Sequence, residues 1–211
     1  MRQWLKPART LRPAGFVPPM IPRLVTKPPS GDEWLHQIKY DGYRMQLVKT
    51  GERARLFTRG GRDWTKRYPR VIESTKVINA ASYVIDGELV VEDEDGGSDF
   101  EMLHSRKHDA TAMLWAFDLL ALNGEDLRQL PLETRNAKLA KLLKGSRQSG
   151  IGLTDHVKAP GAKVFQAACE LGVEGIVSKR RDSLYRSGST RSWLKTTNPN
   201  APGVTRFQDR E

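Results

Sequence analysis

Short apolar runs, several of them alternating with polar residues, fill the chain from Trp34 onward and are separated by turn residues. Alternation with a period of two favours half-buried strands, and a continuous apolar run of similar length favours a strand buried on both faces. The runs predict strands at residues 34–39, 45–49, 54–58, 83–91, 113–120, 175–178 and 192–196. The run at 113–120 is the most continuous, which predicts that this strand lies inside the protein.

Two other segments show helical spacing. The first begins near Pro131, has leucines at positions 132, 139, 142 and 143, and ends at Gly145. The second begins at about Gly161, has apolar residues at positions 164, 165, 168 and 171, and ends at Gly172. Because strands and helices do not alternate strictly, the sequence predicts an α+β domain of mixed, mostly antiparallel sheets flanked by helices, and not a Rossmann fold.

The two ends of the chain differ from its middle in composition. Residues 1–27 contain six basic residues and no acidic ones, together with several prolines, and residues 198–203 are rich in turn formers. We therefore expect an irregular basic arm at 1–30, one folded domain at 31–199 and a short tail at 200–211.

The balance of charge narrows the class of partner. The 211 residues carry a net charge of +10 at pH 7, which favours a polyanion such as nucleic acid. No apolar run approaches the ~20 residues needed to cross a bilayer, so no membrane partner is expected. Cys169 is the only cysteine, which excludes an intramolecular disulfide and a cysteine-based metal site and indicates a reducing compartment.

The most informative polar stretch is Lys39-Tyr40-Asp41-Gly42, which follows an apolar strand. A lysine amine in such a place can act as a nucleophile toward phosphorus. The same residues also suit a strand that runs into an Asp-Gly turn. The stretch therefore acquires a chemical meaning only through partners farther along the chain.

Such partners follow in order: a basic glycine-containing loop at 58–64, the acidic pair Asp86 and Glu88 inside an apolar strand, an aromatic strand at 114–120, and a glutamate with two lysines within 174–195. Each has an ordinary structural explanation as well: a hairpin loop, core aromatics, or a solvated strand pair. For Trp115 we expect a core position. Together they supply a nucleophile, metal-binding carboxylates, phosphate-binding lysines and a base-stacking ring, which attack on a nucleotide α-phosphate requires.

This set of motifs, in this order, resembles the covalent nucleotidyltransferases, and specifically the adenylation domain of ATP-dependent DNA ligases. The matching stretches are K-x-D-G at 39–42, T-R-x-G at 58–61, D-G-E at 86–88, A-F-D-L at 116–119, E-G-I-V-S-K at 174–179 and W-L-K at 193–195, and Phe16–Met20 resembles the segment that precedes them. The resemblance covers the chain from about Phe16 to Pro199. It is nearest to the ligase domains of bacterial end-joining ligases and implies their ATP-grasp-like nucleotidyltransferase fold.

The resemblance also implies roles for individual residues. Lys39 would form the covalent AMP adduct, and Asp41 would shape the site around it. Glu88 and Glu174 would hold Mg²⁺ or Mn²⁺. The residues expected to bind ATP are Gln37, Ile38, Arg44, Arg59, Glu88, Phe117, Lys179 and Lys195, with Phe117 stacking on adenine, Arg44 and Arg59 on the ribose or the DNA 5′-phosphate, and the two lysines on the α-phosphate.

Three departures from the family pattern alter these expectations. Gln37 stands where a glutamate often reads the adenine amino group, and Thr197 replaces a second lysine in the last strand. The chain also ends without the OB-fold domain that family ligases normally have, so self-adenylation is expected to be slow and an OB-fold or end-joining protein is expected to act in trans.

The resulting expectation is an ATP-dependent DNA ligase that seals nicked double-stranded DNA during repair in the bacterial cytoplasm, associated with the nucleoid. The alternatives are a non-catalytic nick-binding module that kept the fold, and an RNA ligase or capping-type nucleotidyltransferase.

Overall fold

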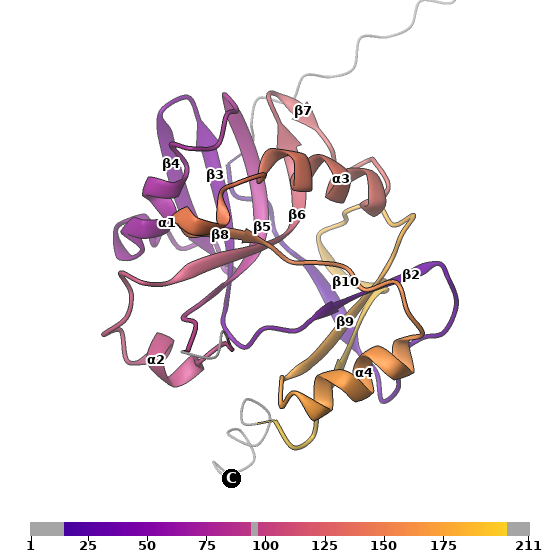
Figure 1. Cartoon of the computed structure of the whole chain (residues 1–211). Coiled ribbons are helices and arrows are strands. Elements are labelled where there is room, and N and C mark those ends of the chain that lie inside the picture. The colour runs from indigo at the N-terminus through magenta and orange to yellow at the C-terminus, as the bar shows by residue number, and fades with distance from the viewer. Residues whose placement is uncertain (1–14, 94–96, 202–211) are drawn as a thin grey trace, which may run out of the picture.

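Two β-sheets, inclined to each other, organise the computed structural model, which describes residues 15–93 and 97–201 (Figure 1). Sheet A has the strand order β1 (Met20–Leu24), β10 (Gly188–Thr197), β9 (Gly175–Arg180) and β2 (Trp34–Ile38). Sheet B has the order β4 (Arg53–Thr58), β3 (Tyr43–Thr50), β5 (Ser82–Val90), β6 (Met113–Leu122) and β7 (Glu125–Asp126), and β8 (Ile151–Leu153) also pairs with β6.

Most neighbouring strands are antiparallel, and the exceptions are the parallel pairs β1–β10 and β6–β8. The expected α+β class with mixed, mostly antiparallel sheets is therefore confirmed. All seven strands expected from the apolar pattern are present, although their ends move by up to four residues. The largest shift is at β10, which begins at Gly188 and not at 192.

Four helices flank the sheets in the described part of the chain: α1 (Pro69–Ser74), α2 (Phe100–His104), α3 (Leu132–Leu142) and α4 (Gly161–Glu170). Short 3₁₀ turns lie at Thr65–Arg67 and Arg147–Ser149. The helix α3 packs on β6, and α4 packs on β9 and β2 (Figure 1). The two helices expected from periodicity are confirmed, whereas α1 and α2 are too short to show a period. No helix among the described residues has the length and apolar character needed to span a membrane.

Sheet B contributes to two apolar cores, one on each face. Its outer face packs with the helices around residues such as Leu47, Ile85 and Leu139, and its inner face packs against sheet A through Val84 and Trp193. Alternate residues of a strand point to opposite faces, so a strand such as β5 can serve both cores. The inner core lies next to the space between the sheets, where the functional groups converge.

A fully buried ion pair joins α3 to sheet B. The guanidinium of Arg135 donates to both carboxylate oxygens of Asp118, at 2.8 Å each, and both side chains are completely buried. The remaining donors of Arg135 reach the carbonyl oxygens of Leu130 at 2.6 Å and Ser183 at 2.8 Å. A buried pair of this kind is tolerated because its other donors are also satisfied.

The expectation of an irregular arm at residues 1–30 is wrong at Met20–Leu24, because β1 lies there and pairs in parallel with β10. Prolines at 18, 19 and 22 concealed the strand, although proline is compatible with a strand at the edge of a sheet. Residues 1–14 of the expected arm and 202–211 of the expected tail lie outside the described residues.

Candidate active site

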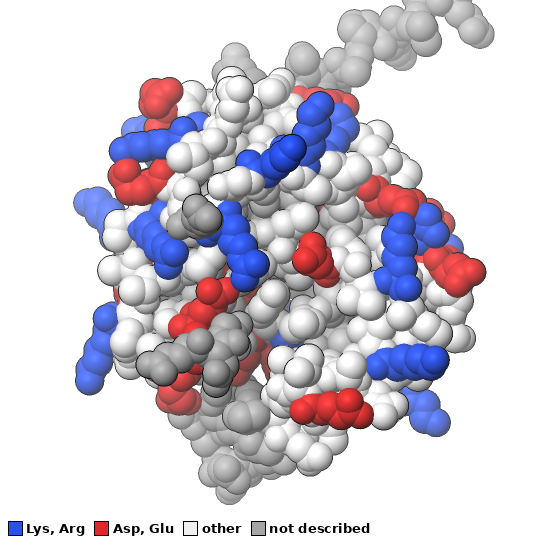
Figure 2. Space-filling view, viewed as in Figure 1, with Lys and Arg blue, Asp and Glu red and all other residues white. Residues whose placement is uncertain are grey.

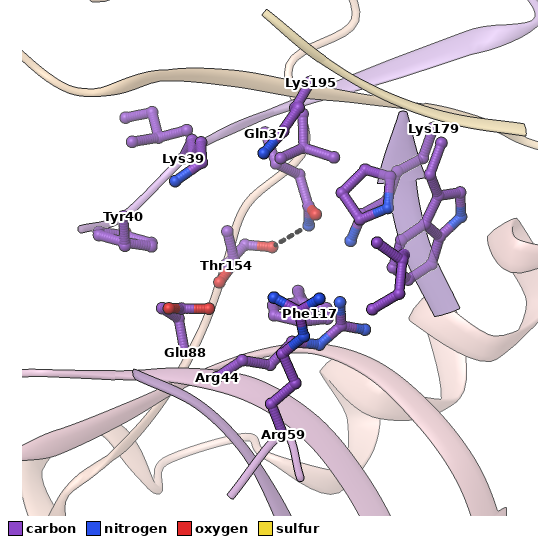
Figure 3. A pocket seen from close by; sticks show the side chains of 15 residues that line it. Gln37, Lys39, Tyr40, Arg44, Arg59, Glu88, Phe117, Thr154, Lys179 and Lys195 are labelled. Atoms are coloured by element: carbon purple, nitrogen blue, oxygen red, sulfur yellow. Dashed lines mark hydrogen bonds between the residues drawn. The ribbon is translucent and has the colours of Figure 1, made fainter. Parts of the chain in front are cut away.

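A cavity of about 250 Å³ lies between the two sheets (Figure 3). Nine of the residues singled out from the sequence line it: Gln37, Ile38, Lys39, Arg44, Arg59, Glu88, Phe117, Lys179 and Lys195. These residues come from both sheets and from positions more than 150 residues apart in the chain. The sequence therefore predicted most of the groups that the fold brings together.

Lys39 lies immediately after β2 and marks one end of the cavity. Its backbone N–H donates to the carbonyl oxygen of Gly175 at 2.9 Å, which ties it to the start of β9. Its ammonium group forms an ion pair with the carboxylate of Glu174, and both side chains are mostly buried. The lysine is thus held at the cavity wall by a carboxylate from a distant part of the chain.

Asp41 lies beyond the end of β2, which stops at Ile38. Asp41 lies outside the cavity lining, and its backbone N–H donates to the hydroxyl of Ser98 at 3.3 Å. The next residue, Gly42, passes so close to β5 that a Cβ there would collide with the carbonyl oxygen of Leu89. The structure therefore explains the glycine of this motif by close backbone approach.

The two acidic residues of β5 have different surroundings: Asp86 binds Arg44, and Glu88 lines the cavity. Asp86 is buried and holds Arg44, accepting from Nε at 3.1 Å and from Nη2 at 2.8 Å. Although burial opposes the charged form, the neighbouring Asp86 carboxylate raises the pKa of Arg44. Glu88 lies two residues along on the same face of the strand and lines the cavity.

Glu88 lies among several charges. Burial raises the pKa of Glu88 to about 7, Lys39 and Arg44 oppose this shift, and Glu174 and Asp86 add to it. The two glutamates therefore lie close enough to repel each other near Lys39. Among residues 15–93 and 97–201, no cluster of three or more acidic, histidine or cysteine side chains could hold a metal.

The other end of the cavity is aromatic. The ammonium of Lys179 lies 4.2 Å from the ring centroids of both Phe117 and Trp193, and the guanidinium carbon of Arg44 lies 5.2 Å from that of Phe117. Lys179 is 2% exposed, and its Nζ has no hydrogen-bond partner in the described structure. Burial lowers the pKa of Lys179 to about 7, with Asp118 opposing the shift.

Lys179 and Lys195 lie at different positions along the cavity. The two lysines were expected on adjacent strands, and both do line the cavity from adjacent strands. The ammonium of Lys179 is enclosed by Phe117 and Trp193, whereas Lys195 lies toward the Lys39 end (Figure 3). A shared role at an α-phosphate stays a prediction from the sequence.

The sequence suggested no role for several lining residues, among them Ile21, Pro22, Tyr40, Thr154 and Val177. Thr154 contributes a backbone carbonyl oxygen, which accepts from Nε2 of Gln37 at 3.1 Å and so orients the amide (Figure 3). A backbone contact of this kind leaves no signal in the residue type. Tyr40 stacks on Trp115 with ring centroids 5.3 Å apart, and Trp115 is 8% exposed, which confirms its expected core position.

Comparisons with known proteins agree with the motifs. Residues 20–196 match the model of the ATP dependent DNA ligase domain family. The multifunctional non-homologous end joining protein LigD of Pseudomonas aeruginosa is 35% identical over 199 residues, which cover 90% of this chain and 24% of that protein. The DNA ligase of Sulfophobococcus zilligii is 32% identical over 211 residues, which cover 88% of this chain and 34% of that protein. The chain thus spans about a quarter to a third of the length of these relatives.

Solved structures lead to the same family. A mycobacterial DNA ligase D complexed with ATP and MES superposes with a TM-score of 0.77 at 31% identity, covering 85% of this chain and 59% of that one. The ligase domain of LigD from Mycobacterium tuberculosis gives 0.76 at 31% identity, covering 85% and 58%. With a family match over most of its length and the motif residues gathered in one cavity, the chain belongs to the ATP dependent DNA ligase domain family.

Proposed function

We propose that this chain carries out the adenylation chemistry of an ATP-dependent DNA ligase. Lys39 forms lysine-AMP, the AMP passes to the 5′-phosphate of a nick, and a 3′-hydroxyl then displaces it to seal the strand. The observation that carries the proposal is the placement of Lys39, paired with Glu174, at one end of a cavity whose other end is aromatic.

In the first step the unprotonated Nζ of Lys39 attacks the α-phosphorus of ATP. A nitrogen–phosphorus bond forms, the bond from that phosphorus to the oxygen bridging to the β-phosphate breaks, and pyrophosphate leaves. Glu174 contacts Nζ directly, so it orients the amine and is the carboxylate best placed to take its proton. Lys195 and Arg59 line the cavity and neutralise phosphate charge.

The aromatic end of the cavity suits the base. Phe117 offers a ring for stacking, and Gln37, whose amide nitrogen is engaged by Thr154, offers its amide oxygen to the adenine amino group. Lys179 lies beside Phe117, which supports a role for its ammonium near the base and not at the α-phosphate. This assignment replaces the phosphate role that the sequence suggested for Lys179.

A divalent cation fits the pair formed by Glu88 and Glu174. Burial raises the pKa of Glu88 to about 7, and the charge of Glu174 adds to this rise. The nearby cations Lys39 and Arg44 therefore do not fully offset the negative charge of Glu88. Mg²⁺ commonly binds through one or two carboxylates together with water and substrate phosphates, so a third acidic ligand is not required. Mg²⁺ or Mn²⁺ bound there would offset charge on the phosphates.

Nicked double-stranded DNA is the proposed polymer substrate. A cleft of about 480 Å³, which we call the basic cleft, lies on β4 and the turn that follows; its lining includes Arg53, Arg55, Lys66 and Arg67 together with the acidic Asp63. Arg67 is paired with Asp109, but Arg53, Arg55 and Lys66 form no ion pair with any described residue. Lys and Arg side chains lie along the flank that carries β4 and α1, with Asp and Glu side chains among them (Figure 2).

The same strand connects this basic cleft to the cavity. β4 ends at Thr58, and Arg59 directly after it lines the cavity. A phosphate backbone lying along β4 would therefore lead to the nucleotide site. The names of the LigD relatives further support a role in end-joining repair, which we propose takes place at the bacterial nucleoid with an OB-fold or end-joining protein as partner.

The test is a labelling assay with α-labelled ATP and Mg²⁺ or Mn²⁺, followed by denaturing electrophoresis, on the wild-type chain and Lys39→Ala. We expect a covalent label in the wild type that is absent from the variant. A second assay measures sealing of nicks that already carry AMP. A chain that takes no label and seals no pre-adenylated nick contradicts the proposal, and nick binding that survives Lys39→Ala without either activity would favour a binding module.

A further inference from the structure

Tyr185 lies in the segment between β9 and β10, outside every motif used to identify the cavity. It is 3% exposed, and its hydroxyl forms two hydrogen bonds. The O–H donates to Oδ2 of Asp86 at 2.6 Å, and the oxygen accepts from the backbone N–H of Met20 at 3.0 Å. Both partners belong to strands far from Tyr185 in sequence, β5 and β1.

These bonds are part of a closed ring of hydrogen bonds. Asp86 accepts from two nitrogens of Arg44, and Nη1 of Arg44 donates to the carbonyl oxygen of Met20 at 2.7 Å. The ring thus runs from Tyr185 to Asp86, Arg44, Met20 and back to Tyr185. Met20 belongs to sheet A, while Arg44 and Asp86 belong to sheet B, so the ring joins the two sheets beside the cavity.

The ring determines the position of the Arg44 guanidinium. The guanidinium is planar with five N–H donors in fixed directions, and three of them are engaged within the ring. The guanidinium carbon lies over the ring of Phe117, at the cavity wall. Oδ2 of Asp86 is shared between Arg44 and Tyr185, so the hydroxyl of Tyr185 fixes the carboxylate that orients the arginine.

The ring also fixes a second part of the wall. Met20 is 1% exposed, and the next residues of β1, Ile21 and Pro22, line the cavity opposite sheet B. Because Met20 is bonded on its N–H side by Tyr185 and on its carbonyl side by Arg44, the ring sets the spacing between this strand and β3. A nucleotide in the cavity would lie between these two walls.

We propose that Tyr185 is a positioning residue for the nucleotide: its hydroxyl, through Asp86 and Met20, holds Arg44 and the β1 wall at the spacing that ATP requires. The proposal rests on the proposed function. It assigns to Tyr185 an effect on ATP binding and not on the chemical step, because Tyr185 does not itself line the cavity.

The variant Tyr185→Phe removes both hydrogen bonds and keeps the packed ring. We expect the Kd and KM for ATP to rise by roughly tenfold, the effect of one hydrogen bond to a charged group. The rate of Lys39 labelling at saturating ATP should change less than twofold. A variant that is merely less stable would contain less active protein, so less of it would be labelled. Its KM for ATP would not rise while the labelling rate stayed constant.

Tyr83→Phe is the matched control. Tyr83 lies on β5 three residues before Asp86, is fully buried, and its hydroxyl has no hydrogen-bond partner in the described structure. Removing that hydroxyl should leave the Kd for ATP unchanged. If Tyr185→Phe behaves like Tyr83→Phe while the wild type binds and is labelled by ATP, the inference is wrong and the proposed function stands.

A double-mutant cycle tests whether Tyr185 acts through Arg44. In the Arg44→Ala background, Tyr185→Phe should weaken ATP binding by less than tenfold, because Arg44 is gone and only the hold on the β1 wall through Met20 is left to lose. Equal effects of Tyr185→Phe in both backgrounds overturn the inference. A wild-type chain that neither binds ATP nor is labelled overturns the proposed function and this inference together.

Discussion

Lys179 and Trp193 lie directly opposite each other on β9 and β10, and the lysine ammonium is 4.2 Å from the centroid of the indole ring. Phe117 lies at the same distance from that ammonium. A cation between two rings gains attraction from their faces, but it has lost the hydrogen bonds of water, and Nζ has no partner among the described residues. The surroundings of Lys179 therefore favour its neutral amine more than the surroundings of an exposed lysine would.

This relationship predicts a pH dependence of stability. The pKa of Lys179 is lowered from 10.5 to about 7 by burial, so between pH 7 and 10.5 the unfolded chain binds a proton that the folded chain does not. Folding stability contributed by this group therefore rises as pH rises. Relative to Lys179→Met, the wild-type free energy of unfolding should increase by up to about 1.4 kcal/mol per pH unit across that window.

Urea unfolding of both proteins at several pH values from 7 to 10 measures this difference directly. Groups common to both chains cancel in the comparison. A difference that is flat with pH, or that falls as pH rises, would show that Lys179 keeps its proton in the folded state.

Glu174 should control the rate of self-adenylation. Glu174→Gln keeps the size of the side chain but removes the charge that holds the Lys39 ammonium. The rate of labelling at saturating ATP should fall on the order of 10²-fold, the usual effect of losing a positioned acid–base group. Glu170→Gln is the control, because Glu170 is exposed on α4 and, among the described residues, bonds only to Gln166 in the same helix. Equal rates in the two variants would remove Glu174 from the mechanism.

The basic cleft should contribute to the salt dependence of nick binding. The triple variant Arg53→Ala/Arg55→Ala/Lys66→Ala removes the three cleft cations that form no ion pair within the described part of the chain. If each contacts a phosphate, the slope of log K against log salt should become shallower by about 2 to 3, while lysine labelling continues.

A charge-matched control is available on another surface. Lys138, Lys141 and Lys144 lie at and after α3, away from β4, and their replacement by alanine removes the same charge. A slope that changes equally in the two triple variants would indicate an effect of net charge alone and would count against the basic cleft as a DNA surface.

The buried pair of Arg135 and Asp118 should be costly to break. Arg135→Met leaves the Asp118 carboxylate in a site with no access to solvent, which typically costs 3 to 5 kcal/mol. The exposed Arg181–Glu133 pair is a control, and Arg181→Met should cost less than about 1 kcal/mol. Denaturant unfolding of both variants measures the two values, and similar values would contradict the structural importance of the buried pair.

The residues of the site that could best be predicted from the sequence were the charged residues in short motifs. Lys39, Glu88 and Lys195 were predicted because few residue types can perform their tasks, and all three line the cavity. The strand pattern also predicted most of both sheets. By contrast, β1 was missed because three prolines near it resemble an irregular segment, and proline is excluded only from the interior of a sheet.

Contacts that depend on backbone groups or on distance along a cavity could not be predicted. The carbonyl of Thr154 could belong to any residue, and the hydroxyl of Tyr185 finds its partners only when its segment meets two distant strands, β5 and β1. The face of β9 on which Lys179 lies follows from alternation. Its place between Phe117 and Trp193 depends on how the two sheets are inclined, which no local pattern encodes.

The segment from Lys39 to Gly42 crosses from β2 in sheet A to β3 in sheet B. The two sheets are therefore joined covalently at the nucleophile, whereas beside Arg44 they are joined by hydrogen bonds and apolar packing. The spacing of the sheets at the Arg44 end can therefore change without a change in the covalent path, while the attacking amine stays with the segment that joins them.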